Sequence, residues 1–129
     1  MFSKTKLVIV AVAAALLTAC GGEGGSDAYV PPSYGSIALN RTNGAAGITA
    51  NYSSQGDANS NAIDTCGAGC ATVFEFGSYL CGALARGSNF TYGWASSSRK
   101  SNAEGDALST CQARGGISCV VVLAECNSN

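Results

Sequence analysis

The 129-residue chain contains no histidine. This absence excludes Ser-His-Asp and Cys-His catalytic sites, together with every metal centre that needs an imidazole ligand. The cysteines show no paired C-x-x-C spacing, so a zinc site built from cysteine alone is not indicated either. We therefore expect no metal and no cofactor.

Charged residues are also scarce, at 12% of the chain. Ser97 and Lys100 spell the S-x-x-K of penicillin-binding enzymes, but the partner motifs S-D-N and K-T-G are absent. The acidic residues lie where helix caps and polar helix faces place them, without the apolar surroundings that a general acid requires. The sequence therefore predicts a protein that is not an enzyme.

Long hydrophobic segments are absent as well. The longest apolar run, Leu7–Leu17, has eleven residues, whereas a helix needs about 20 to span a bilayer. A basic start followed by a short apolar run is typical of a secretory signal peptide. The run ends in Leu17-Thr18-Ala19-Cys20, which fits the lipobox of bacterial lipoproteins. We expect a lipoprotein signal peptide over 1–19 and acylation of Cys20; the alternative is a simple cleaved signal with a chance cysteine.

Acylation of Cys20 determines the cellular location that we expect for the protein. Two or three acyl chains on Cys20 anchor a protein stably to a membrane. Gly21 rather than Asp follows the cysteine, which by analogy with enterobacterial sorting favours the outer membrane, with the protein facing the periplasm. Residues 20–33 are rich in glycine and end in Pro31-Pro32, so they are expected to form a flexible tether.

The chain after Cys20 has five basic and eight acidic residues, a net charge of −3. A nucleic-acid-binding domain normally carries a basic patch or stripe, and none is present. The expected partners are therefore a membrane, through the lipid anchor, and a protein of unknown identity, but no nucleic acid.

Of the seven cysteines, six remain once Cys20 is acylated. Export places these six in an oxidising compartment, where an even number of thiols in a small domain indicates a disulfide framework. Six cysteines allow 15 pairings, which spacing alone does not resolve. The six are Cys66, Cys70, Cys81, Cys111, Cys119 and Cys126.

Residues 34–129 contain two similar halves, 34–80 and 81–129, at an offset of 45 to 49 residues. The stretch "YGSIAL" lies over "CGALAR", "AAGITA" over "TYGWAS", and "CATVFEF" over "CVVVLAE". The strongest match places Ala58, Ala62, Ile63, Thr65 and Cys66 over Ala103, Ala107, Leu108, Thr110 and Cys111. The regularity of the offset indicates a duplicated unit.

Each half predicts the same order of elements. Two short apolar runs flank turn-forming residues at 40–44 and at 87–89, which indicates a β-hairpin. A helix follows, with an expected N-cap at Asp57 in the first half and Ser101 in the second, and then one more strand. The expected fold is a single α+β domain over 34–129. In it, two ββαβ repeats form one largely antiparallel six-stranded sheet, with both helices on one face and disulfides as staples.

The second half carries three short motifs: Cys81-Gly82-Ala83-Leu84-Ala85, Tyr92-Gly93-Trp94, and Ala103…Ala107-Leu108…Cys111. In their order and cysteine spacing they resemble the family known as domain of unknown function 4189. This family comprises small secreted or lipid-anchored bacterial proteins that often begin with Tyr-Gly-x-Ile-Ala, like residues 34–38. The resemblance implies a fold and a location, and it carries no established catalytic residues.

The duplication also suggests how the cysteines pair. A duplicated unit is expected to reuse its own bridge, which pairs Cys66 with Cys70 and Cys111 with Cys119. Cys81 and Cys126 have no cysteine counterparts in the first half and are left for each other. An alternative stays open in the first half, where Cys66 could instead reach Cys81.

The second hairpin, "GSNFTYGWAS", supplies the candidate binding surface. Phe90, Tyr92 and Trp94 alternate along the sequence, so we expect them to project from one face of a strand. Aromatic residues and arginine dominate interface hot spots, and Arg86 and Arg99 flank the stretch. These residues either form a contact surface or, in the case of the three aromatics, a core beneath a helix.

Two non-enzymatic functions fit these features. In the first, the protein binds and neutralises a toxin that acts in the periplasm, as an immunity lipoprotein does. In the second, it is an envelope accessory factor, exposed at the cell surface, that contacts host or cell-wall material.

Overall fold

The computed structural model describes residues 28–129. The expected signal peptide over 1–19, Cys20 and the first part of the tether lie outside the described residues. Within the described part of the chain, no helix is long and apolar enough to cross a membrane.

One compact unit runs from Pro31 to Asn129, so it begins slightly before the expected start at Tyr34. Ser33 belongs to this unit: its side chain is buried, and its backbone N–H donates to Ser78 Oγ at 3.0 Å. The last residues of the expected tether are therefore part of the folded unit.

The unit contains two consecutive ββαβ segments. The first consists of β1 (Tyr34–Leu39), β2 (Ala46–Tyr52), α2 (Gln55–Cys66) and β3 (Ala71–Phe76). The second consists of β4 (Cys81–Arg86), β5 (Tyr92–Ser97), α3 (Lys100–Ala113) and β6 (Val120–Cys126). In each segment the first strand is central and pairs antiparallel with the other two. The α+β class and the two ββαβ units are thus confirmed.

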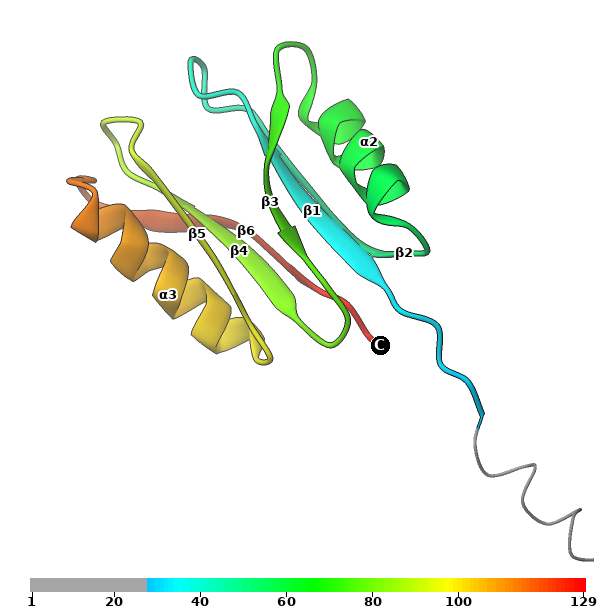
Figure 1. Ribbon diagram of the computed structural model, residues 1–129. Helices are drawn as coiled ribbons and strands as arrows, with labels where there is room; N and C mark the ends of the chain where they lie inside the picture. Colours follow the sequence, from blue (N-terminus) through cyan, green and yellow to red (C-terminus); the bar gives the residue numbers. More distant parts are fainter. Residues whose placement is uncertain (1–27) are drawn as a thin grey trace, which may run out of the picture. The chain divides into compact units, whose positions relative to one another are not determined.

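The arrangement of the units differs from the expected single six-stranded sheet. The strands form two separate three-stranded sheets, in the orders β2-β1-β3 and β5-β4-β6. The sheets face each other, and each helix covers the outer face of its own sheet, so α2 and α3 lie on opposite sides (Figure 1). The expectation that both helices share one face was wrong.

The reason lies in the central strands, which are apolar on both faces. In β1, Ile37 and Leu39 point into the core between the two sheets, whereas Ala38 packs beneath α2. In β4, Leu84 faces the same central core, and Ala83 packs beneath α3. A single sheet with both helices on one face would leave the larger side chains in water. Facing sheets bury them, and burial of an aliphatic side chain contributes about 1.5–3 kcal/mol.

Small residues let each helix lie almost directly on its sheet. A Cβ built on Gly47 would lie 2.5 Å from Ala62 O, and one built on Gly93 would lie 2.9 Å from Cys111 Cα. The two glycines occupy equivalent positions in the repeat. A glycine at this position is therefore a packing requirement of the ββαβ unit.

The helix N-termini differ from the sequence-based expectation. The N-cap of α2 is Ser54, whose Oγ accepts from the Asp57 N–H at 3.1 Å. Asp57, the expected cap, lies in the first turn, where its negative charge is favourable near the helix N-terminus. The N-cap of α3 is Arg99, which makes no side-chain capping bond, so Ser101 lies inside the helix.

The structure contains three disulfides, and they join the pairs that the duplication suggests. Cys66–Cys70 and Cys111–Cys119 each link the end of a helix to the loop before the next strand. Cys81–Cys126 links the start of β4 to the end of β6, where the two residues are direct partners in the sheet register. The alternative in which Cys66 reaches Cys81 is not the one formed.

Candidate functional site

Four connections gather at one end of the unit, toward the upper left of Figure 1. We call this the loop end. It follows from the topology, because the first strand and the helix of each repeat both run toward it. The four connections are residues 40–45, 67–70, 87–91 and 114–119. The chain enters the unit at the opposite end, where β1 begins.

An asparagine in the hairpin turn of each repeat fixes the loops of that repeat. In the first, Asn40 Nδ2 donates to Ala68 O at 3.2 Å. In the second, Asn89 Nδ2 donates to Gly115 O at 3.1 Å. Each asparagine therefore joins a hairpin turn to the loop that follows the helix, and the loop end is held by the same contact twice.

Trp94 lies in β5, near the loop end, and its ring contacts two arginines. The guanidinium carbon of Arg41, from the β1–β2 turn, lies 5.3 Å from the centroid of the Trp94 ring. That of Arg114, just after α3, lies 4.7 Å from the same centroid. Arg114 Nη1 also donates to Tyr92 O at 3.3 Å. Both distances fall within the range of a cation–π interaction, so the indole positions a guanidinium from each repeat.

Three further side chains converge on Gly44. A Cβ built on this glycine would lie 3.1 Å from Arg86 Nη1, 3.2 Å from the Phe90 ring and 3.4 Å from Tyr92 Oη. Arg86 Nη1 donates to Gly44 O at 3.2 Å. Gly44 has a φ of +79°, which glycine adopts readily and other residues do not. The turn can therefore approach these side chains closely.

The aromatic residues divide between core and surface. Tyr92 is only 4% exposed and belongs to the core between the sheets, and among residues 28–129 its hydroxyl has no hydrogen-bond partner. Phe90 is 53% exposed, lies in the turn before β5 and has a φ of +58°. Trp94 is half-buried and packs against this core.

We define the arginine–aromatic surface as Arg41, Arg86, Phe90, Trp94 and Arg114. Of the residues expected from the sequence, Arg86, Phe90 and Trp94 lie on it, and Tyr92 lies beneath it. Arg99 does not belong to it. Arg99 comes two residues after Ser97, the last residue of β5. Ser97 pairs with Cys81 at the start of β4, so Arg99 lies at the end of β5 opposite to the loop end.

Sequence reasoning missed Arg41 and Arg114, because each is distant in sequence from the aromatic hairpin. A signal was nevertheless present. Arg41 lies in the predicted hairpin turn of the first repeat, and Arg114 directly follows the predicted helix of the second. In a ββαβ unit these two connections reach the same end, so arginines there belong with the second hairpin turn.

The arginines of this surface bond to carbonyl groups and to an indole. Within residues 28–129 they form no ion pair with a carboxylate, and Arg41 and Arg114 are exposed. Most carboxylates of the unit lie away from the loop end, since Asp57 is in the first turn of α2 and Glu75 and Glu125 lie near the ends of β3 and β6. Glu104 and Asp106 lie in the first half of α3, and Asp64, in the last turn of α2, is the carboxylate of residues 28–129 nearest the loop end. A chain with excess negative charge thus presents a cationic, partly aromatic surface at the loop end.

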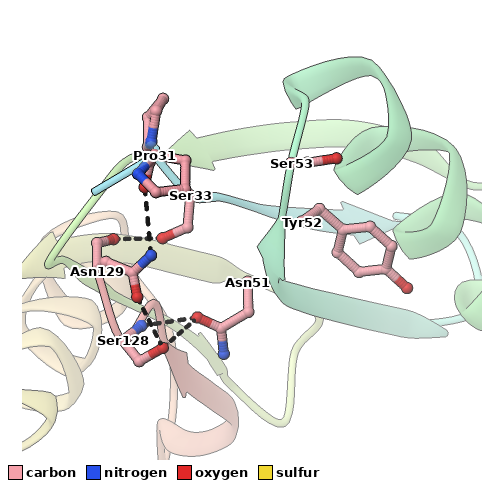
Figure 2. Close-up of a pocket in the computed structure, with 8 residues that line it drawn as sticks. Pro31, Ser33, Asn51, Tyr52, Ser53, Ser128 and Asn129 are labelled. Atoms are coloured by element: carbon pink, nitrogen blue, oxygen red, sulfur yellow. Dashed lines mark hydrogen bonds between the residues drawn. The ribbon is translucent and has the colours of Figure 1, made fainter. Parts of the chain in front are cut away.

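A second feature is an open cleft of about 280 Å³ at the opposite end of the unit. It is lined by Pro31, Pro32, Ser33, Asn51, Tyr52, Ser53, Ser128 and Asn129. Figure 2 shows Asn51, Ser128 and Asn129 directed toward one another on one side, with the Tyr52 ring turned away from them.

The polar groups of this cleft mainly bond to each other. Asn51 Oδ1 accepts from Ser128 N at 2.7 Å, and Asn129 Nδ2 donates to Pro31 O at 3.2 Å (Figure 2). Asn51 N donates to the buried Asn127 Oδ1 at 2.7 Å. These contacts join β2 of the first repeat to the segment after β6, so the residues hold the repeats together. The arginine–aromatic surface, in which Arg41 and Arg114 are exposed, is the stronger candidate for binding.

The described residues contain no group of three or more Cys, Asp or Glu side chains that could hold a metal ion. All six cysteines in this part of the chain are in disulfides. The loop end offers a ligand guanidinium N–H donors, an indole ring and an exposed phenyl ring.

Comparison with known proteins gives two similarities. Residues 34–126 match the family model described as Domain of unknown function (DUF4189). The NMR structure of Rv1813c from Mycobacterium tuberculosis is similar to the fold with a TM-score of 0.57 at 25% sequence identity, over 78% of this chain and 79% of that chain. No match to the chain is found among curated proteins.

Proposed function

The chain belongs to the DUF4189 family, and from that premise we propose that it is a non-enzymatic, lipid-anchored protein of the bacterial envelope. In this proposal the arginine–aromatic surface binds another protein. The bound protein is a toxin that acts in the periplasm, and this chain is its immunity protein or inhibitor.

One observation carries the proposal. Three of the five basic residues in 28–129 gather at the loop end around aromatic side chains, and no carboxylate within these residues forms an ion pair with them. Arginine and tryptophan are enriched among the residues that dominate protein–protein binding energy. Exposed Ile117 and Val120, from the neighbouring loop and the start of β6, add apolar area.

The position of the surface supports a role in capturing a partner. The chain enters the folded unit at the end opposite to the loop end. A tether that leads from an acylated Cys20 would therefore attach to the unit away from the surface, and leave the surface accessible. Three disulfides suit a small domain that must persist in an oxidising compartment.

The first test replaces an exposed aromatic residue of the surface. We expect Phe90→Ala to change the free energy of unfolding by less than about 0.5 kcal/mol, because an exposed side chain loses few contacts. The same variant is expected to lose partner binding by about tenfold or more, as truncation of a hot-spot residue does. Partners are identified by mass spectrometry after pull-down of the acylated protein from envelope extract, and binding is then measured with the purified partner.

Tyr79→Ala is the matched control. Tyr79 is 61% exposed against 53% for Phe90, also has a positive φ, and lies in the β3–β4 connection at the opposite end. It should retain full binding. Equal loss of binding in both variants would place the contact elsewhere. A partner from host or cell-wall material would favour the alternative function of an envelope accessory factor.

The second test concerns the anchor. We expect Cys20→Ser to accumulate as an uncleaved precursor and to lose its acyl anchor, because processing and anchoring both depend on acylation of this thiol. The measurement is fractionation with a carbonate wash, together with the mass of the product. Cys20→Ser protein of mature mass that still fractionates with membranes would contradict the lipoprotein proposal.

A further inference from the structure

We propose that the arginine–aromatic surface recognises an acidic segment of its protein partner, and that Arg41 and Arg114 bind the carboxylates of that segment. This inference rests on the proposed function and names the chemistry of the partner. The assignment starts from the pair of guanidinium groups that Trp94 holds at 5.3 Å and 4.7 Å from its ring centroid.

Contact with the indole prepares these arginines for a ligand. A guanidinium that lies over an aromatic ring keeps its N–H groups in the plane of the guanidinium, where they can form paired hydrogen bonds with a carboxylate. Arg114 is further fixed by its bond to Tyr92 O. Because the side chains are already positioned, binding loses less conformational entropy than it would with free arginines.

The charge distribution selects an acidic partner and its orientation. Residues 28–129 carry six acidic and five basic side chains. Three of the five basic side chains lie at the loop end, so an acidic segment is attracted to this end. Exposed apolar side chains border the arginines. Phe90 and Arg86 converge on Gly44, Val120 is the register partner of Arg86, and Ile117 O accepts from Ser88 Oγ in the turn that carries Phe90. The fitting segment therefore combines carboxylates with apolar side chains, which is a property of a protein and not of a nucleic acid.

The position of the surface also argues against the anchoring membrane as its ligand. The chain enters the unit at the opposite end, so the loop end and the point of tether attachment are separated by the length of the strands. Anionic lipid headgroups and free phosphate share the charge of a carboxylate, and the experiment distinguishes them by using a separate probe for each.

Trp94 provides a direct measurement, because it is the one tryptophan in the chain. The folded protein, excited selectively at tryptophan, is titrated at low salt with a hexaglutamate peptide. We expect a saturable change in Trp94 fluorescence, because carboxylates that bind Arg41 and Arg114 alter the charge next to the indole. Hexaglutamine should give no change, and added NaCl should weaken hexaglutamate binding, since exposed charges are screened.

The variants Arg41→Gln and Arg114→Gln are each expected to weaken hexaglutamate binding by about tenfold, the loss of a charge-assisted contact. Arg99→Gln is the control, because Arg99 is equally exposed but lies at the other end of β5. The Arg99→Gln variant should bind hexaglutamate with an affinity within about twofold of that of the unchanged protein, since Arg99 lies far from the site. Circular dichroism verifies that all three variants stay folded.

Each outcome decides the inference. Absence of a fluorescence change with hexaglutamate at millimolar concentration overturns it, as does equal weakening by Arg99→Gln and Arg41→Gln. Tighter binding of inorganic phosphate, or of phosphatidylglycerol vesicles, than of hexaglutamate also overturns it in favour of a phosphate ligand. If a purified partner loses affinity with Phe90→Ala but not with Arg41→Gln or Arg114→Gln, the inference fails while the proposed function stands.

Discussion

Gly93→Ala is expected to destabilise the domain by on the order of 3 kcal/mol, although it adds a single methyl group. The added Cβ would meet the backbone of α3 at Ala107 O and Cys111 N. These are backbone atoms, so no rotation of a side chain can relieve the contact. The helix would have to move away from β5, which opens the core formed by Ala83, Ala103 and their neighbours.

The measurement is thermal and urea unfolding followed by circular dichroism. A loss of 3 kcal/mol lowers the melting temperature of a domain of this size by more than about 10 °C. Gly105→Ala is the matched control within α3, because a Cβ at Gly105 meets nothing within 4 Å. It should stabilise the domain by about 0.5–1 kcal/mol, since alanine favours the helix over glycine. A Gly93→Ala variant as stable as Gly105→Ala would contradict the close packing of α3 on β5.

The elements of the fold were predictable because the chain repeats itself. Gly47 and Gly93 fall on equivalent positions, and so do the buried alanines of α2 and α3, so each half supports the interpretation of the other. The number of sheets was not predicted, because pairing between strands distant in sequence leaves no local signal. The informative feature was the apolar run within each first strand, Ile37–Leu39 in β1 and Cys81–Ala85 in β4. A central strand that is apolar on both faces must pack against another element on each face. The helix of its own repeat packs on one face, and the sheet of the other repeat packs on the second.

The sequence predicted those residues of the site that are close together along the chain, and missed those that only the topology brings to it. Phe90 and Trp94 are close together in the sequence and reach the same surface. Phe90, however, lies in the turn before β5, and not in the strand that the alternation predicted. Arg41 and Arg114 reach the same surface only through the topology, because Arg41 lies 53 residues before Trp94 and Arg114 lies 20 residues after it. Arg99 is near Trp94 in sequence, but the rest of β5, which ends at Ser97, carries the chain to the opposite end of the sheet before Arg99.

Tyr92 shows how one strand can serve both core and surface. Its ring is buried between the sheets, and its carbonyl accepts from Arg114. The core that stabilises the domain therefore also positions one of the two arginines that Trp94 holds. Variants of Tyr92 would change stability and binding together, and for this reason the exposed Phe90 and Arg41 are the better probes of function.

Removal of the Cys81–Cys126 bridge is expected to have the largest effect of any change to the disulfides. The bridge closes a segment with a sequence separation of 45, against 4 for Cys66–Cys70 and 8 for Cys111–Cys119. The entropy that a crosslink removes from the unfolded chain grows with the logarithm of this length. The estimate is about 4 kcal/mol for the long segment and about 2 kcal/mol for the shortest.

The structure adds a second reason for this ranking. Cys81 and Cys126 are partners in the register of β4 and β6, so the bridge holds the end of the chain to the central strand of its sheet. Asn127 follows directly and is buried, and its Nδ2 donates to Phe76 O at 3.1 Å and to Gly77 O at 2.7 Å. Without the bridge, the last strand and this contact with the first repeat can separate together.

The test compares the double variants Cys81→Ala with Cys126→Ala, and Cys66→Ala with Cys70→Ala, by urea unfolding under oxidising conditions. We expect the first pair to lose about twice the free energy of unfolding that the second pair loses. Peptide mapping without reductant verifies that the remaining bridges have not exchanged. If both double variants lose the same free energy of unfolding, or the Cys66/Cys70 variant loses more, the short bridge stabilises the folded state directly. In that case native contacts between α2 and β3, and not the entropy of the unfolded chain, would set the value of each bridge.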